Sequence, residues 1–352
     1  MSLTLVPHAE SWRTAVRALN ERMRPKGGFG FFEQPVPDWL PPRAGARLRR
    51  EYFVAVEADG TARGGYALKH EPASLLGSPT LVASVQGPYS EGAVDSRHAR
   101  VVFTMIRDMI RRQPLLYGWG LERRASTIIK LFHTFGWRSH ATPFLFWVGL
   151  PYAARDCRRV TPQGDRCEAV ATLDACADAV WERCAPRYAF VVRRDGETLE
   201  EMYPSANRQF HRLIIRRGDH PIGWAIVGHR RFRRHPRLRF AHVGVIWDCF
   251  AAPEDAAAVI AAAHRYVIRQ GAWIVLASAS HAAWIAALRA RRFRMGRTSR
   301  YFLVSPAFAA ALDPFEQRAA ECFLTFGDGE SYQGTLGRAI FDATNGQDTP
   351  HR

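Results

Sequence analysis

The spacing of apolar residues predicts alternating strands and helices through the first half of the chain. The clearest helix begins at about Ser96 and carries one apolar stripe at helical spacing. That stripe consists of Val102, Met105, Ile106, Met109 and Ile110. The remaining predicted elements of this half are strands over 3–6, 51–57, 63–69, 81–86, 115–119 and 142–150 and helices over 10–23 and 123–135.

The second half repeats nearly the same order of elements. Its strands are predicted over 169–173, 210–216, 223–228, 240–249, 273–277 and 301–304, with a hairpin across 217–219. Helices are expected from Asp174, from Pro253 and over 281–291. A proline followed by two acidic residues, as at Pro253, is typical of a helix start. The repetition indicates two units of similar architecture.

Length and composition agree with two folded domains. The chain has 352 residues, of which 47% are hydrophobic and 12% aromatic, enough for packed cores. No apolar run approaches the roughly 18 residues that a membrane span requires, and residues 1–13 do not resemble a secretory signal. These features predict a soluble, cytoplasmic protein without a transmembrane segment.

The formal net charge of +16 comes from 49 basic and 33 acidic residues, and 46 of the basic residues are arginine. Arginine binds phosphates and other anions bidentately, so coenzyme A, nucleotide-linked sugars, lipid phosphates and tRNA are all candidate partners. The six cysteines form no C-x-x-C pair, and His229 and His235 lie in an arginine-rich stretch that would repel a cation. No metal site is predicted.

The order strand, helix, antiparallel hairpin, strand, helix, strand, helix, strand resembles the GNAT superfamily of N-acyltransferases, twice in tandem. Local patches support the resemblance at Val85–Val94 and Phe132–Trp137, and the tail at Thr325–Glu330 resembles GNAT-like proteins found with bacterial exopolysaccharide genes. It implies an α+β fold with two mixed sheets, each flanked by helices. The expected division is 1–152, a linker over 153–166, a second GNAT-like domain over 167–306, and a tail over 307–352.

In GNAT proteins the strand before the long helix separates from its neighbour, and acyl-CoA lies between them. The resemblance therefore implies acetyl-CoA or another acyl-CoA as co-substrate, with its pyrophosphate on backbone N–H groups near the helix N-terminus. The residues placed there are Gly87, Tyr89, Ser90, Glu91, Gly92, Ala93 and Val94. Of the three family positions, Gly92 keeps a glycine, whereas Tyr89 and Val94 depart from the pattern. An ordinary strand-to-helix turn is the alternative, and the second copy, at Phe250–Asp255, has no glycine.

The tyrosine that many GNAT enzymes use as an acid is replaced by Phe132 in the first copy and by Leu288 in the second. Candidate catalytic carboxylates are Glu91 and Glu122, each following a strand, with a pKa that an apolar wall would raise. Solvated loop acids are the alternative. In the second copy Asp248 lies inside an apolar strand, where it must be paired or functional. His281 is one possible partner, and an arginine is another.

The loop that covers the acceptor site in GNAT proteins corresponds here to a segment containing Phe29, Phe31 and Trp39. Arg230 and Arg233 belong to an arginine cluster that would hold an anionic acceptor. Core packing for the aromatic residues and a solvated basic surface for the arginines are the alternatives.

Three functions remain open from the sequence. The first is transfer of an acyl group from acyl-CoA to an amine, or a hydroxyl, of a small-molecule or sugar acceptor, including a lipid- or nucleotide-linked one. The second is a Fem-like transferase that takes an aminoacyl group from tRNA. The third is a catalytically silent GNAT fold that binds a ligand or partner.

Overall fold

The computed structural model describes residues 3–28, 30–122, 126–149, 164–232 and 240–329. Strands and helices alternate through the first half much as the apolar pattern predicts. Its elements are β1 (Leu3–Pro7), α1 (Arg13–Met23), β2 (Arg49–Glu57), β3 (Ala62–Leu75), β4 (Ser78–Ser90), α2 (Val101–Arg112), β5 (Leu116–Glu122), α3 (Ser126–His133) and β6 (Arg138–Val148).

The second half follows the same order with a short strand and helix added. Its elements are β7 (Arg166–Val170), α4 (Asp174–Cys184), β8 (Phe190–Val192), α5 (Gly196–Met202), β9 (His211–Arg217), β10 (His220–Arg231), β11 (His242–Ala251), α6 (Ala256–Arg269), β12 (Ile274–Ala277), α7 (Ala282–Ala290) and β13 (Arg294–Val304). A terminal segment adds α8 (Pro306–Ala311), α9 (Phe315–Arg318), β14 (Cys322–Phe323) and the turn η10 (Phe326–Asp328).

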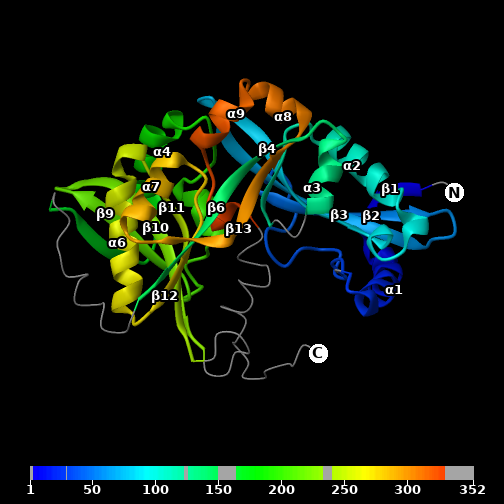
Figure 1. The fold of residues 1–352 in the computed structure, drawn as a ribbon, viewed down its shortest axis with the longest axis horizontal. Helices are drawn as coiled ribbons and strands as arrows, with labels where there is room; N and C mark the ends of the chain where they lie inside the picture. Colours follow the sequence, from blue (N-terminus) through cyan, green and yellow to red (C-terminus); the bar gives the residue numbers. More distant parts are fainter. Residues whose placement is uncertain (1–2, 29, 123–125, 150–163, 233–239, 330–352) are drawn as a thin grey trace.

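The described strands join one mixed sheet, and the two halves exchange their closing strands within it. The main order is β1-β2-β3-β4-β5-β13-β6-β12-β11-β10-β9-β7. Strand β13 of the second half pairs with β5 of the first, and β6 of the first half pairs with β12 of the second. Figure 1 shows β6 and β13 side by side where the two halves meet. The mixed α+β fold with helices flanking the sheet is therefore confirmed.

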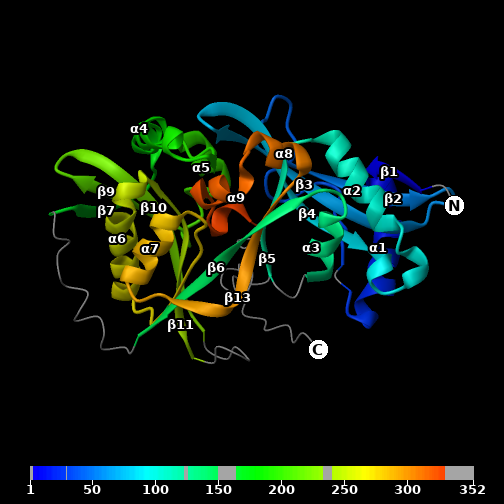
Figure 2. The ribbon, with the colours of Figure 1, turned by 45° about the horizontal axis from the view of Figure 1, so that its top comes forward.

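Side-chain alternation along the strands divides the first half into two cores. Phe53 and Ala55 of β2 face α2, whose Met105, Ile106 and Met109 are fully buried. Tyr52 and Val54 face the opposite way and pack against α1. Figure 2 shows these helices around the strands of the first half. Predicted and observed boundaries differ at β4, because the strand continues through Ser90 and α2 begins only at Val101.

Residues 306–329 are part of the core. Phe308, Leu312 and Phe315 are fully buried, and β14 pairs with β8, which in turn pairs with β3 of the first half. Residues 306–329 thus connect the two halves, and the expected tail over 307–352 applies at most to the residues after 329, which lie outside the described part.

Candidate functional site

Strands β4 and β5 pair at two positions and then separate. The parallel pairs are Ala83 with Leu116 and Ser84 with Tyr117. Beyond them β4 continues to Ser90 against β3, while β5 continues to Glu122 against β13. We call the diverging part of the two strands, residues 85–90 and 118–122, the β4–β5 fork. The facing edges of the fork have no strand partner among the described residues.

A β-bulge lies on β4 inside the fork. Across the β3–β4 ladder Ala67 pairs with Gln86 and Gly65 with Tyr89, so Gly87 and Pro88 of β4 lie opposite the single residue Tyr66, and β4 holds one extra residue. Gly87 has a φ of 100°, a conformation that favours glycine. Such bulges turn backbone groups away from the ladder and occur beside active sites. Because proline has no N–H group, Gly87 supplies the only amide donor of the bulge.

The corresponding separation in the second half is occupied by the chain itself. Strands β11 and β12 pair from Val243 to Ile246, after which β11 continues alone on that side. Thr325 forms an antiparallel bridge with Ala279, and its hydroxyl donates to Asp248 Oδ1 of β11 at 2.9 Å. The amide of Ser280 also donates to the carbonyl of Leu324 at 3.0 Å. The segment around Thr325 therefore lies between β11 and the chain that follows β12.

Asp248 belongs to a buried ion cluster that fastens this segment. Arg194 Nε donates to Asp248 Oδ1 at 3.1 Å, and Arg194 Nη2 bonds to Asp328 Oδ2. All three side chains are 1% exposed. Tyr203 also donates to Asp248 Oδ2, at 3.2 Å. Burial raises the pKa of Asp248, and Arg194 opposes that rise.

The partner of Asp248 is thus an arginine, and the pairing with His281 is wrong. His281 caps the N-terminus of α7, where its Nδ1 accepts the amide of Ala283 at 3.1 Å. Burial lowers the pKa of His281 to about 4. Asp248 therefore supports a structural ion cluster and His281 a helix cap, and the two do not form a reactive pair.

Glu91 follows β4 directly, as predicted, but it is held by two arginines. Arg22 Nε donates to Glu91 Oε1 at 2.8 Å, and Arg63 Nη1 donates to Oε2 at 3.1 Å. Burial favours a higher pKa for this carboxyl, but the hydrogen bonds from Arg22 and Arg63 outweigh it, and the pKa is lowered. The raised pKa expected of Glu91 is wrong, and a lowered pKa makes it a poor base.

The amides predicted to cradle a pyrophosphate are partly engaged within the chain. Gly87, Tyr89 and Ser90 lie in β4, and Glu91, Gly92 and Ala93 form a 3-10 turn before Val94. The Gly92 amide donates to Ser90 Oγ at 3.1 Å, and the Val94 amide to the carbonyl of Glu91 at 3.0 Å. A Cβ atom at Gly92 would lie 2.6 Å from the carbonyl oxygen of His98. Close contact with the 3-10 turn over Ser96–His98 therefore explains why residue 92 is a glycine.

Two of the predicted acceptor residues, Phe31 and Trp39, lie beside the β4–β5 fork, whereas Arg230 does not. Phe31 is buried among Phe32, Tyr52 and, from β4, Tyr89. The ring of Trp39 lies 5.6 Å from the guanidinium of Arg50, which bonds to Gln86 of β4 inside the fork. Arg230 is on β10, six strands from β4 in the sheet, or about 29 Å at the usual strand spacing. Phe29, Arg233 and the side chain of Glu122 lie outside the described residues.

A buried charged cluster at the base of the fork was missed by sequence reasoning. Lys69 and Glu71 of β3 are 1% and 0% exposed, with Lys69 Nζ 2.9 Å from Glu71 Oε2. The Tyr117 hydroxyl of β5 donates to Glu71 Oε1. Burial raises the pKa of Glu71, while Lys69 and Tyr117 oppose that rise. The sequence does contain a signal for this cluster: Lys69, one of few lysines in the chain, lies at the end of a predicted strand, two residues before Glu71.

Two further findings concern the described part of the chain. It contains no group of three or more His, Cys, Asp or Glu side chains arranged to hold a metal ion. None of its helices has the length and apolar character needed to cross a membrane.

Comparisons with known proteins establish the fold. No family model matches the chain, and no curated protein sequence matches it. A GCN5-related N-acetyltransferase from Anabaena variabilis ATCC 29413 superposes with a TM-score of 0.50 at 13% identity, covering 72% of this chain and 62% of its own length. The present chain therefore matches less than two thirds of that protein.

Two more solved structures are similar. A conserved protein of unknown function from Enterococcus faecalis V583, described as a probable N-acyltransferase, has a TM-score of 0.53 at 10% identity, covering 88% of this chain and 74% of that one. The GCN5-related glucosamine N-acetyltransferase region of a fungal multi-domain β-N-acetylglucosaminidase also gives 0.53 at 10% identity, covering 86% of this chain and 38% of that one. At such identities the likeness is one of fold.

Proposed function

Because the chain has the fold of the GCN5-related N-acetyltransferases, we propose that it transfers an acyl group from acyl-CoA to an amine of a small-molecule or sugar acceptor. The observation that carries the proposal is the β4–β5 fork. Two strand edges without a strand partner can bind an extended chain that contains amide groups, by the same hydrogen bonds that extend a sheet. The pantetheine arm of CoA is such a chain.

The phosphates of CoA would lie where α2 begins. The first amides of a helix have no partner within it, and they form the positive end of its dipole. The N-cap residue Arg100 is exposed and gives no side-chain cap to α2. This arginine and the first-turn amides of α2 are our proposed phosphate ligands, in place of the engaged amides of Gly92 and Val94.

The transfer itself needs one base and one donor to the thioester oxygen. A neutral amine attacks the thioester carbon, so that the C–N bond forms as the C–S bond breaks and CoA leaves as a thiolate that takes a proton from solvent. We assign the donor to the amide of Gly87 in the bulge. We assign the base to solvent water, because Glu91 is held by two arginines and Glu71 is 0% exposed and paired with Lys69.

The second half takes no part in binding CoA under this proposal. Thr325 and its neighbours lie between β11 and the chain after β12, so a second pantetheine would have to displace a buried segment. One acyl-CoA per chain is therefore expected.

The test is calorimetric titration with acetyl-CoA, longer acyl-CoAs and free CoA, on the wild type and on two variants. Arg100→Glu should weaken binding at least tenfold, because a hydrogen bond between charged groups contributes about 1.5–3 kcal/mol. Arg107→Glu makes the same charge change at an exposed position further along α2, and it should bind like the wild type.

Two results would contradict the proposal. Absence of binding by every CoA species would exclude an acyl-CoA enzyme, and salt-sensitive tRNA binding in the same samples would favour the aminoacyl transferase. Equal loss in Arg100→Glu and Arg107→Glu would mean that net charge, and not a site at the start of α2, governs the affinity.

A further inference from the structure

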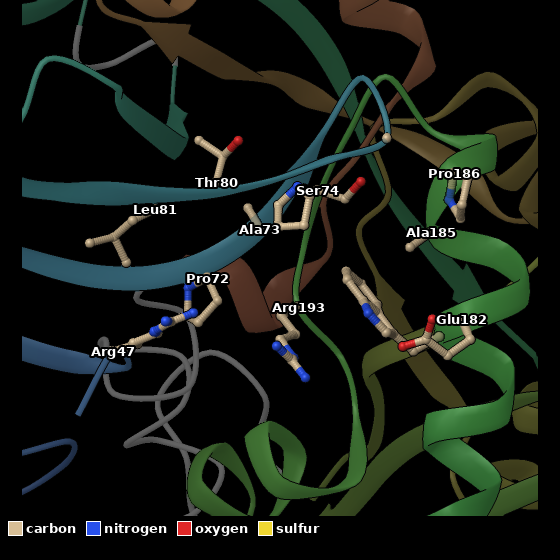
Figure 3. A pocket seen from close by; sticks show the side chains of 13 residues that line it. Arg47, Pro72, Ala73, Ser74, Thr80, Leu81, Glu182, Ala185, Pro186 and Arg193 are labelled. Carbon is tan, nitrogen blue, oxygen red and sulfur yellow. The ribbon is translucent and has the colours of Figure 1, made fainter. Parts of the chain in front are cut away.

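A cavity of about 510 Å³ lies where the β3–β4 hairpin of the first half meets α4 of the second half. Pro72, Ala73 and Ser74 of β3 and Thr80 of β4 form one wall, and Glu182 and Ala185 lie on the opposite side (Figure 3). A volume of this size is ordinary for a site that binds a small organic molecule.

This cavity is separate from the β4–β5 fork. Along β4, Thr80 at the cavity and Gln86 in the fork are six residues apart, which is about 20 Å in an extended strand. The paired residues Ala83 and Ser84 lie between them. A ligand of this cavity would therefore occupy a site that the proposed acyl-CoA does not reach.

The two arginines of the cavity present guanidinium groups on one side of it (Figure 3). Arg47 is exposed and forms no ion pair with any described residue. The backbone amide of Arg193 donates to the carbonyl of Pro72 at 2.9 Å, which fixes the chain at this point. Its Nε bonds to Asp195 Oδ2, which leaves the two terminal nitrogens of Arg193 for another partner. Two such groups suit a phosphoryl group, whose several oxygens can accept from both.

The remaining lining suits a ring that carries hydroxyl groups. Trp181, which is 9% exposed, and Pro186 offer flat apolar surface, of the kind on which sugar and base rings lie. Glu182 would repel a phosphate at the α4 side, but its carboxylate can accept hydrogen bonds from hydroxyl groups. The phosphate end of a ligand is therefore directed to Arg47 and Arg193 and the hydroxyl-bearing end to Glu182.

We infer that this cavity binds a sugar phosphate, either free or as part of a nucleotide. The inference rests on the cavity alone and does not require that the chain use acyl-CoA.

The experiment is calorimetric titration at low ionic strength with glucose 1-phosphate, UMP, inorganic phosphate and glucuronate as probes. Glucose 1-phosphate or UMP should bind more tightly than inorganic phosphate and than glucuronate, which carries a carboxylate in place of the phosphate. Arg47→Glu should weaken that binding at least tenfold. Arg43→Glu is the matched control, because it reverses the same charge in the same exposed loop outside the cavity, and it should bind like the wild type.

Binding of none of the probes, or equal binding by Arg47→Glu and the wild type, would overturn the inference. Equal affinity for inorganic phosphate and for both sugar phosphates would overturn it as well. The two proposals fail separately: loss of the sugar phosphate in Arg47→Glu with no binding of any CoA species refutes only the acyltransferase. Displacement of UMP by CoA would place both ligands in one site and refute the second site.

Discussion

Replacing Arg194 by methionine tests whether the ion cluster fastens the terminal segment to the second half. The guanidinium contacts Asp248 on β11 and Asp328 in η10, and it also donates to the carbonyl of Val192 at 2.8 Å. In Arg194→Met the two carboxylates stay buried without their shared cation. Removal of one partner from a buried ion pair costs about 3–5 kcal/mol, because the remaining charge has lost its compensation.

The expected loss can be measured by thermal unfolding. A change of about 3–5 kcal/mol lowers the melting temperature by roughly 6–10 °C, at roughly 2 °C per kcal/mol for a large domain. Without Arg194 the pKa of Asp248 rises further above its ordinary value. Folding then favours proton uptake, so the deficit of the variant should shrink as the pH falls from 8 to 5.

The triple variant Arg194→Met/Asp248→Asn/Asp328→Asn is the control for charge. It removes the two uncompensated carboxylates along with the cation, and it should recover most of the lost stability. A melting temperature of Arg194→Met within 2 °C of the wild type would refute the role of the cluster. A triple variant as unstable as the single one would show that packing, and not charge, is responsible.

Two further predictions concern pH. Glu91→Gln should lower the free energy of unfolding at pH 7 by about 1–3 kcal/mol, because Arg22 and Arg63 lose a charged acceptor. Since the folded-state pKa of Glu91 is lowered, the difference should begin to shrink only as the pH falls below about 4.3, the ordinary pKa of glutamate, and urea unfolding at pH 7 and pH 3.5 measures it; a constant difference would contradict it. Burial and the neighbouring His211 and His242 lower the pKa of His229 to about 4, so the wild type should lose stability between pH 6.5 and pH 4. His229→Gln should lose less over that range, and an unchanged pH profile would contradict the assignment.

Much of the fold is readable from local patterns. The stripe through Met105, Ile106 and Met109 predicted the buried face of α2, and the hairpin predicted across 217–219 lies where β9 ends and β10 begins. These predictions succeed because helical spacing and turn chemistry are local properties. The start of α2 was missed by five residues, since the 3-10 turns over Glu91–Ala93 and Ser96–His98 precede it.

The exchange of β6 and β13 between the two halves could not be predicted from local sequence patterns. Alternation along a strand indicates which side chains face the core, but it does not identify the neighbouring strand. Tyr301 and Phe302 of β13 pair with Leu121 and Trp119 of β5, about 180 residues earlier in the chain. Nothing near β5 in the sequence reveals that partner.

For the candidate site, too, contacts between residues distant in the sequence could not be predicted. Asp248 was singled out because a carboxylate in an apolar strand needs a partner, and that reasoning is sound. Its partners, however, come from Arg194 and from Thr325 in a segment expected to be a tail. Glu71 was missed because its surroundings come from β5 and from residues after 320, and spacing within β3 does not reveal them.

The exchanged strands constrain how the protein is made. During synthesis the edge of β5 that later receives β13 waits until some 180 further residues have been added, and β12 likewise depends on β6 from the first half. A nascent chain that stops before Val304 therefore exposes an unpaired strand edge, which is a template for aggregation. Contacts between residues so distant in sequence also slow folding. Neither half is expected to fold as a separately expressed fragment, so the chain reaches its native state only as a whole.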